Sequence, residues 1–167
     1  MRRDAAYWIN TLQLKKHIEG GYYRENYRSQ LNIYKDILPE SFHGDRSAAT
    51  CIYFLLEKDS FSAFHKIASD EIWHFYSGDC LIIYEIKNDG SLLEHRLGPN
   101  PESHESFQVV VKAGNWFAAK LNGGGEYALA GCTVSPGFDF DDFEMAKREI
   151  LLRDYPEYES LIISLTS

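Results

Sequence analysis

The sequence predicts a single, mostly β domain with short helices at its two ends. Aromatic residues make up 14% of the chain. They fall in short apolar runs separated by turn residues, a spacing typical of a β-sandwich or barrel. The length of 167 residues fits one domain, and 44% hydrophobic with 25% charged residues is the composition of a folded globular chain. We therefore treat residues 1–167 as one all-β unit.

The first predicted element is a short amphipathic helix. Apolar residues recur at helical spacing between residues 4 and 16. Gly20 and Gly21 then break this pattern, and an extended segment begins at Tyr22.

The predicted strands follow from residue 50 onward. The run from Thr50 to Glu57 is almost continuously apolar, which predicts a strand covered on both faces. Asn88-Asp89-Gly90 is a hairpin turn signal between two later runs. The other predicted strands are residues 61–67, 72–76, 80–86, 92–97, 107–111, 116–121 and 127–134. Residues 98–104 contain two prolines and predict a loop.

The end of the chain returns to a helical pattern. Acidic residues at 141, 142 and 144 precede the segment 145–153, which fits a helix with acids in its first turn. A second helical piece is predicted for residues 155–165, beginning near Pro156.

Charge and cysteine usage exclude several classes of function. The chain has 17 Lys and Arg against 25 Asp and Glu, a formal charge of −8, and no basic cluster. We therefore expect neither a nucleic acid nor a membrane as its partner. The longest apolar run, residues 51–56, is far shorter than the ~20 residues of a spanning helix. Cys51, Cys80 and Cys132 lack metal-site spacing, and we expect free, buried thiols in a cytoplasmic protein.

The densest group of chemically active side chains lies on two adjacent predicted strands. His65 lies near the end of the first strand. Alternation along the second strand places Glu71 and Trp73 on one face and His74 on the other. A carboxylate beside an indole is unusual for a purely structural inward face, and a ligand pocket is one way to give both groups partners.

This region resembles the first sequence motif of the cupin superfamily. His65, Glu71 and Gly78 stand at the positions of that motif's first histidine, its glutamate and its last glycine. Ile67 stands in place of the second histidine, and Phe117 in place of the histidine of the second motif. Two of the four usual ligands are missing, so the resemblance implies no tightly bound transition metal and no cofactor, since three or four ligands are the norm.

Four segments of the chain, in order, are similar to the cupin-5 family, which was long labelled a domain of unknown function. These segments are residues 19–25, 53–56, 69–78 and 134–143. The resemblance implies a double-stranded β-helix, the jelly roll of the cupins, with a pocket inside the barrel. It also implies a homodimer, in which we expect the N-terminal region and an edge strand to pack across the interface. The resemblance does not indicate a particular reaction, because none is firmly established for this family.

The candidate catalytic residues are His65, Tyr53 and Tyr76. An ordinary histidine pKa of about 6.5 suits a general base, which is the role assigned to His65. Tyr53 or Tyr76 is the candidate proton donor. Arg24 is the candidate anion clamp, because its guanidinium matches carboxylate or phosphate groups.

The candidate ligand-binding residues are Tyr22, Arg24, Glu71, Trp73 and Trp116. Tyr22 and Arg24 are expected at the edge of the barrel mouth. Glu71 either binds the ligand or pairs with a neighbouring side chain, Arg24 or His65. The two tryptophans either stack on a planar ring or sugar or belong to the core.

His74, on the opposite face, is read as structural. If a metal were bound, His65, Glu71 and His74 would be the ligands to examine first.

Two functions remain open, and both need a pocket for a small molecule. The first is a metal-independent isomerase or epimerase of a carbohydrate-like substrate, because some cupin epimerases use a barrel histidine as base and His65 is similar in position. The alternative is a non-catalytic cupin that only holds a small ligand.

Overall fold

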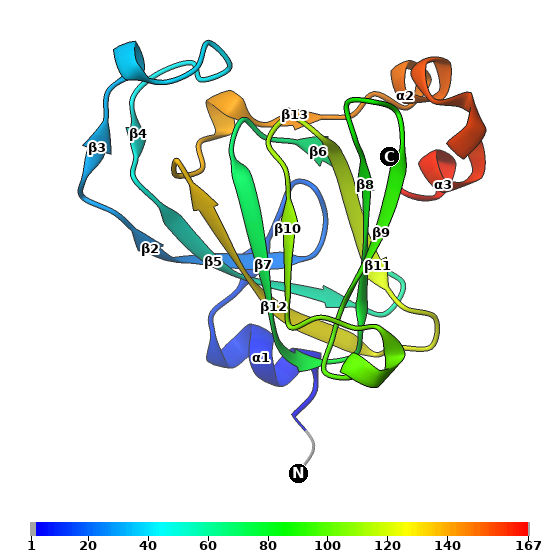
Figure 1. Ribbon diagram of the computed structural model, residues 1–167. Coiled ribbons are helices and arrows are strands. Elements are labelled where there is room, and N and C mark those ends of the chain that lie inside the picture. Colours follow the sequence, from blue (N-terminus) through cyan, green and yellow to red (C-terminus); the bar gives the residue numbers. More distant parts are fainter. Residues whose placement is uncertain (1–2, 167) are drawn as a thin grey trace.

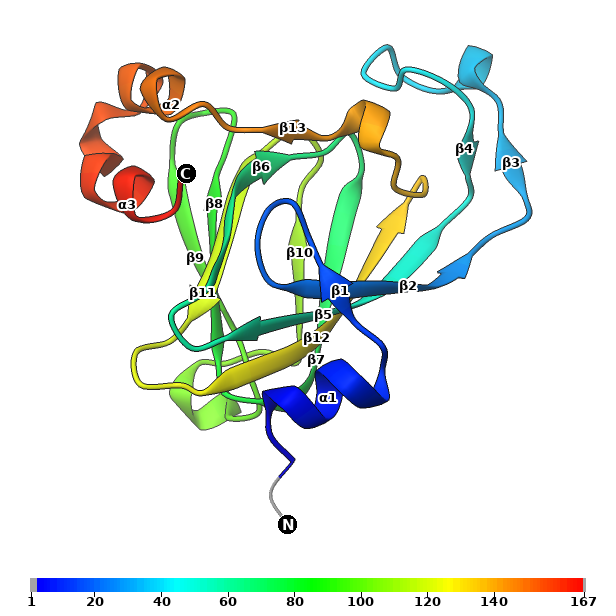
Figure 2. The same cartoon turned by 180° about the vertical axis from the view of Figure 1, so that it is seen from behind.

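Two antiparallel sheets pack face to face in the computed structural model, which describes residues 3–166 (Figure 1). The six-stranded sheet has the order β1-β2-β5-β12-β7-β10, and the five-stranded sheet has the order β13-β6-β11-β8-β9. Figure 2, seen from behind, shows β1, β2 and β5 crossing the opposite side of the molecule. This is a jelly roll, and it confirms the all-β prediction with short helices at the two ends.

All eight strands predicted from residue 50 onward are present, three of them with the predicted bounds. The six-stranded sheet consists of β1 (Lys15–Lys16), β2 (Tyr22–Arg28), β5 (Thr50–Glu57), β7 (Asp70–Gly78), β10 (Gln108–Val111) and β12 (Tyr127–Ser135). The five-stranded sheet consists of β6 (Phe61–Lys66), β8 (Leu81–Ile86), β9 (Leu92–Leu97), β11 (Trp116–Leu121) and β13 (Glu144–Met145). Single 3₁₀ turns are η1 (Lys35–Ile37), η2 (Pro101–Ser103), η3 (Phe140–Asp142) and η4 (Pro156–Tyr158).

The terminal helices are shorter than the pattern predicts. Helix α1 (Ala5–Thr11) begins where the Asp4 side chain accepts a hydrogen bond from the Tyr7 N–H, at 2.8 Å. It ends before Gln13, whose φ of 53° turns the chain into β1. Helices α2 (Arg148–Asp154) and α3 (Glu159–Ser164) follow the second sheet. Met145 was expected in a helix but lies in β13, because the edge of β6 offers it a strand partner in His65.

Residues 29–49 leave the six-stranded sheet as a projecting arm, which the sequence patterns did not predict. Its short strands β3 (Asn32–Ile33) and β4 (Arg46–Ser47) pair with each other, and η1 lies near its tip (Figure 1). Leu31, Tyr34 and Ile37 are 68%, 65% and 74% exposed. The arm therefore presents large apolar side chains to the outside.

The main core lies between the two sheets, and the outer faces of the sheets differ. Leu151 of α2 and Ile162 of α3 pack on Phe64 and Ala118, so the C-terminal helices cover the outside of the five-stranded sheet. Helix α1 covers only part of the outside of the six-stranded sheet, around Leu55. The outer face along β7 and β10 stays open, with Tyr76 and Val110 exposed.

None of the helices within residues 3–166 has the length and apolar character that crossing a membrane requires.

Candidate functional site

A cavity of about 390 Å³ opens between the two sheets. Strands β2, β5, β7 and β12 form one wall, β6 contributes His65 and Ile67 follows it, and the segment 138–140 borders the mouth. His17, Glu19 and Glu71 are among the titratable side chains that line it. Sequence reasoning identified His65 and Glu71 in this group but missed His17 and Glu19.

The turn between β1 and β2 carries His17 and Glu19 into the cavity. Gly20 and Gly21 have φ values of 113° and 70°, which glycine adopts easily. A Cβ on Gly20 would collide with the backbone of Phe61, so only glycine lets the turn pass this close to β6. The Glu19 carbonyl then accepts a hydrogen bond from the Ala63 N–H at 2.8 Å.

Glu19 is the centre of a buried polar group. Its Oε1 accepts a hydrogen bond from the Ser62 hydroxyl at 2.8 Å. Its Oε2 lies 3.3 Å from Nε2 of His65 and 3.3 Å from Nδ1 of His17. Among the described residues, no lysine or arginine forms an ion pair with it. Burial raises the pKa of Glu19, because a carboxylate loses its hydration there.

His65 is held on both sides of its ring. Its Nδ1 lies 2.7 Å from the Ala63 carbonyl, and because a carbonyl only accepts, Nδ1 carries the hydrogen. The ring centroid lies 4.1 Å from that of Phe117 and 5.3 Å from that of Phe143. Burial lowers the pKa of His65 to about 4, so its imidazole is neutral at pH 7.

Glu71 and Trp73 point inward from β7, as strand alternation predicts. Burial raises the pKa of Glu71 to about 8, and the nearby Glu19 carboxyl adds to the effect. Glu71 therefore keeps its proton at neutral pH and is a hydrogen-bond donor. Trp73 is 1% exposed, and its Nε1 has no hydrogen-bond partner within the part of the chain that the structure describes. An unpaired buried N–H beside a cavity suits an acceptor atom of a ligand.

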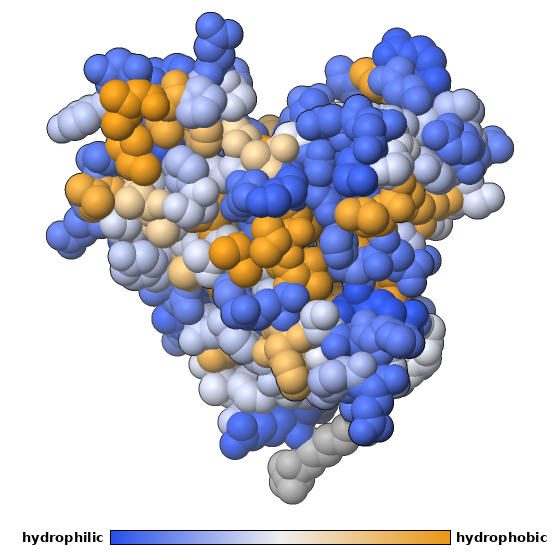
Figure 3. Space-filling view, in the orientation of Figure 1, coloured by the Kyte–Doolittle hydropathy of each residue, from blue (hydrophilic) through white to orange (hydrophobic). Residues whose placement is uncertain are grey.

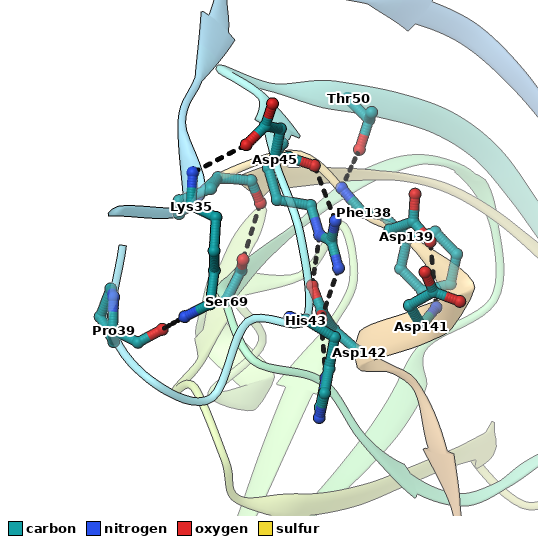
Figure 4. A network of polar contacts seen from close by, with 12 residues as sticks. Lys35, Pro39, His43, Asp45, Thr50, Ser69, Phe138, Asp139, Asp141 and Asp142 are labelled. Atoms are coloured by element: carbon teal, nitrogen blue, oxygen red, sulfur yellow. Dashed lines mark hydrogen bonds and ion pairs between the residues drawn. The ribbon is translucent and has the colours of Figure 1, made fainter. Parts of the chain in front are cut away.

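A buried ion pair holds the segment at the cavity mouth (Figure 4). Nε and Nη2 of Arg46 donate to the two carboxylate oxygens of Asp142, at 2.5 and 2.6 Å. The His43 N–H also donates to Asp142, at 3.0 Å. The Phe138 N–H donates to the Thr50 hydroxyl at 2.9 Å. These bonds join the arm and β5 to the segment that borders the cavity, and the sequence patterns did not indicate them.

The basic residues of the cavity lie at its rim rather than at its buried end. Arg28 forms two hydrogen bonds with the Glu25 carboxylate and a third with the Phe138 carbonyl. Arg24 borders the cavity, but its Nη1 donates to the Leu12 carbonyl at 3.0 Å. Lys15 completes this basic rim.

The three candidate tyrosines lie on the outer face of the six-stranded sheet. Tyr53 and Tyr76 have ring centroids 6.1 Å apart, and Tyr76 is 52% exposed. Phe54, the neighbour of Tyr53, takes the inward position and packs on the main core. Tyr22 packs with Tyr53 beneath α1. The structure therefore does not bring the predicted proton donors to His65.

Trp116 and His74 also lie outside the cavity. Trp116 packs beneath the C-terminal helices, with Nζ of Lys66 4.4 Å from its ring centroid. Nε2 of His74 lies 3.0 Å from the Thr133 hydroxyl, and its Nδ1 lies 3.0 Å from Nε2 of Gln108. His74 is thus on the opposite face from Glu71, and the trio of His65, Glu71 and His74 does not converge on one ion.

The donor set of the cavity does not fit a transition metal held as in metal-binding cupins. The two positions without histidine, Ile67 and Phe117, place apolar side chains against the core. Both ring nitrogens of His65 already face protein groups. Within residues 3–166, no three His, Cys, Asp or Glu side chains are placed to hold one metal ion.

A spacing signal could have identified the missed residues. His17 and Glu19 are two positions apart and directly precede the paired glycines. The glycines permit a close approach of the backbone to β6. The side chains of His17 and Glu19 enter the barrel because of this tertiary contact between the turn and β6.

Known proteins resemble the chain in sequence and in structure. The family described as Cupin superfamily (DUF985) matches residues 6–146. An uncharacterized protein of Saccharomyces cerevisiae is 33% identical over 153 residues, which cover 84% of this chain and 74% of that protein.

Solved structures also resemble the chain. A hypothetical protein from Leishmania major has a TM-score of 0.90 and 34% identity, with 98% of each chain covered. A protein from Shewanella oneidensis has a TM-score of 0.88 and 38% identity, covering 100% of this chain and 99% of that one. Oxalate decarboxylase from Bacillus subtilis has a TM-score of 0.54 at 13% identity, over 90% of this chain and 36% of that one, a likeness of fold alone.

Proposed function

Because the chain belongs to the DUF985 family of the cupin superfamily, we propose that its cavity binds a small polar molecule and transfers a proton on it without a metal. The proposed reaction is the isomerisation or epimerisation of a carbohydrate-like substrate. One observation carries the proposal: two carboxyl groups and two imidazoles are buried together in the cavity, while its basic residues stay at the rim. Buried titratable groups with shifted pKa values are typical of acid–base sites.

Proton transfer beside a carbonyl requires a base, an acid and a group that stabilises the enolate oxygen. In this proposal the base is His65, which acts through Nε2 because Nδ1 is bonded to Ala63. Glu71 is the acid, since a pKa of about 8 leaves it protonated at neutral pH. The free Nε1–H of Trp73 donates to the oxygen on which charge develops.

Glu71 thus replaces Tyr53 and Tyr76 as the proposed proton donor, because both tyrosines face outward. Arg24 remains a candidate only at the mouth, where it joins Lys15 in attracting a polar or anionic end of the substrate.

The test is incorporation of solvent deuterium into candidate keto-sugars. We expect wild-type protein to exchange a carbon-bound hydrogen, and Glu71→Gln to do so about 100-fold more slowly, because the amide keeps the shape but cannot give up a proton to the substrate. His65→Ala should lose exchange as well. Tyr76→Phe, on the outer face, is the matched control and should keep the wild-type rate. Absence of exchange from every sugar in the wild type would contradict the enzymatic proposal.

A non-catalytic ligand-binding cupin is the second candidate, and one observation favours it. Nδ1 of His65 is engaged and Nε2 faces Glu19 at 3.3 Å, so the histidine is well satisfied without a substrate. In this reading Trp73 and Glu71 only hold the ligand. Thermal stabilisation by a sugar that persists in His65→Ala, with no deuterium exchange in either protein, would identify the binder.

We propose a second copy of this chain as its protein partner. Figure 3 shows apolar side chains gathered over the middle of one face, where β7 and β10 run, and over the projecting arm. Phe107, Val110 and Ile37 are exposed there. Large exposed apolar areas of this kind mark association surfaces. A two-fold dimer supplies the same apolar surface from both copies, as the family resemblance implies.

A cytoplasmic location is part of the same proposal. Cys51, Cys80 and Cys132 are free thiols in the structure. Free thiols of this kind fit a reducing compartment.

A further inference from the structure

The Glu19 carboxyl lies between two imidazoles, and its protonation state sets the charge at the buried end of the cavity. Oε2 is 3.3 Å from Nε2 of His65 and 3.3 Å from Nδ1 of His17. The side chains of all three residues are less than 10% exposed. A charge on any one of them would therefore have to be stabilised by another member of this group.

Hydrogen bonds to backbone groups fix the tautomer of each neutral imidazole. His65 carries its hydrogen on Nδ1, which faces the Ala63 carbonyl, so its Nε2 is a lone pair. Nδ1 of His17 accepts the backbone N–H of Glu19 at 3.3 Å, so the neutral ring carries its hydrogen on Nε2. The two nitrogens nearest to Oε2 are therefore both acceptors.

A carboxylate oxygen facing two acceptors gains nothing from either of them. A proton on Oε2 removes the conflict with Nε2 of His65, because a carboxylic acid has one O–H to donate. The other oxygen is already satisfied by the Ser62 hydroxyl.

The remaining titratable groups around Glu19 do not supply a compensating charge. Glu71 on β7 is a second acid, and Cys132 on β12 holds a thiol whose pKa is raised by burial. Burial lowers the pKa of His17, and the nearby charge of Lys15 adds a smaller effect in the same direction.

We propose that Glu19 is a neutral carboxylic acid that carries its proton on Oε2 and positions His17 and His65 as neutral imidazoles. Glu19 is a positioning residue in this arrangement. Its single proton is directed to Nε2 of His65, because the one lone pair of Nδ1 of His17 already accepts the Glu19 N–H. A substrate that gives its proton to Nε2 of His65 displaces this O–H.

This last consequence rests on the proposed proton transfer. The protonation of Glu19 does not, because it follows from the hydrogen bonds of the protein alone.

The experiment is infrared difference spectroscopy on the full chain near neutral pH, comparing the wild type with Glu19→Gln. We expect the difference to show the loss of a protonated carboxylic C=O band. Glu85→Gln is the matched control: Glu85 is also a buried glutamate beside a histidine, but it accepts hydrogen bonds from the Lys112 N–H and the Asn115 amide, and its pKa is lowered. Its substitution should remove carboxylate bands instead. Loss of carboxylate bands in Glu19→Gln as well would overturn the proposal.

Nitrogen-15 spectra of the histidine rings test the wild type without any variant. His65 should show the neutral tautomer with hydrogen on Nδ1, and His17 the neutral tautomer with hydrogen on Nε2. A protonated, cationic ring at either position near neutral pH would overturn the proposal even if Glu19→Gln does not fold. A neutral Glu19 in a protein without deuterium exchange would leave this inference standing while the proposed enzymatic function fails.

Discussion

Phe117 stands directly opposite His65 in the five-stranded sheet, and their ring centroids lie 4.1 Å apart. The phenyl ring occupies the position at which the resembled superfamily has a histidine ligand. It gives His65 an apolar neighbour, which contributes to the burial that keeps this imidazole neutral. One aromatic residue thus favours proton chemistry over metal coordination.

Restoring the two missing histidines should create a metal site. We expect the double variant Ile67→His/Phe117→His to retain near-stoichiometric zinc or manganese after dialysis, because it completes the set of four ligands that the resembled superfamily uses. The Phe117 substitution should cost about 3 kcal/mol of stability as a core change. Elemental analysis is the measurement, with each single variant as control. Near-stoichiometric iron, manganese, nickel or zinc in wild-type protein purified without chelator would contradict the prediction.

Stability should fall on both sides of a mildly acidic optimum. The pKa of Glu71 is raised from 4.5 to about 8, so its contribution to the free energy of unfolding is lost as pH rises from about 4.5 to about 8. The pKa of His65 is lowered from 6.5 to about 4, so its contribution is lost as pH falls through that range. Glu71→Gln should remove the part of the alkaline decline that Glu71 causes, on the order of 3 kcal/mol, while the raised pKa of Glu19 leaves a further decline in place. Urea unfolding across pH measures it, and equal slopes in both proteins would refute the assignment to Glu71.

Trp73→Phe should weaken ligand binding more than it weakens the fold. The indole N–H has no partner among the described residues, so its loss breaks no hydrogen bond and should cost only about 1 kcal/mol of stability. The affinity of the protein for a sugar whose carbon-bound hydrogen it exchanges should drop about tenfold if this N–H binds the sugar. Trp116→Phe, beneath the C-terminal helices, is the matched control and should leave affinity unchanged. Equal losses in the two variants would place the ligand elsewhere.

Breaking the Arg46–Asp142 pair should loosen the cavity mouth. We expect Arg46→Met to destabilise the protein by about 3 kcal/mol, because it leaves the Asp142 carboxylate buried without its cation. The double variant Arg46→Met/Asp142→Leu should recover part of that loss. Urea unfolding gives the free energies, and limited proteolysis reports on residues 137–143. A double variant less stable than the single one would argue against this account.

The wild type should sediment at twice the mass of one chain at micromolar concentration. A variant with Tyr76→Glu and Val110→Glu places two charges on the open sheet face and should sediment as a monomer. Ile150→Glu, an exposed apolar position on α2, is the control and should remain dimeric. A monomeric wild type would disprove the proposed partner.

The sequence predicted the sheets better than it predicted the cavity. Periodicity and turn residues located the strands 50–57, 92–97 and 116–121 with their final bounds. Alternation also placed Glu71 and Trp73 on one inward face, because successive side chains of a strand point to opposite sides, and these two positions of β7 are buried.

The errors have identifiable physical causes. In β5 both faces are apolar, so alternation does not say whether Tyr53 or Phe54 faces the core. Glu19 enters the barrel because of a backbone contact with β6 that no local pattern contains. Arg46 and Asp142 are 96 positions apart, and a bond over that separation leaves no short-range signal.

In the proposed dimer, the C-terminal helices would limit association to two copies. They seal the outside of the five-stranded sheet over Phe64 and Ala118, while the other sheet stays open along β7 and β10. A two-fold dimer through the open face buries that face in both copies. Neither copy then has a second exposed sheet face to which a further copy could bind. A chain without α2 and α3 would expose an apolar face on each of its two sheets instead of on one. Its copies would then associate into open-ended polymers. We therefore expect helices α2 and α3 to prevent polymerisation of the proposed dimer.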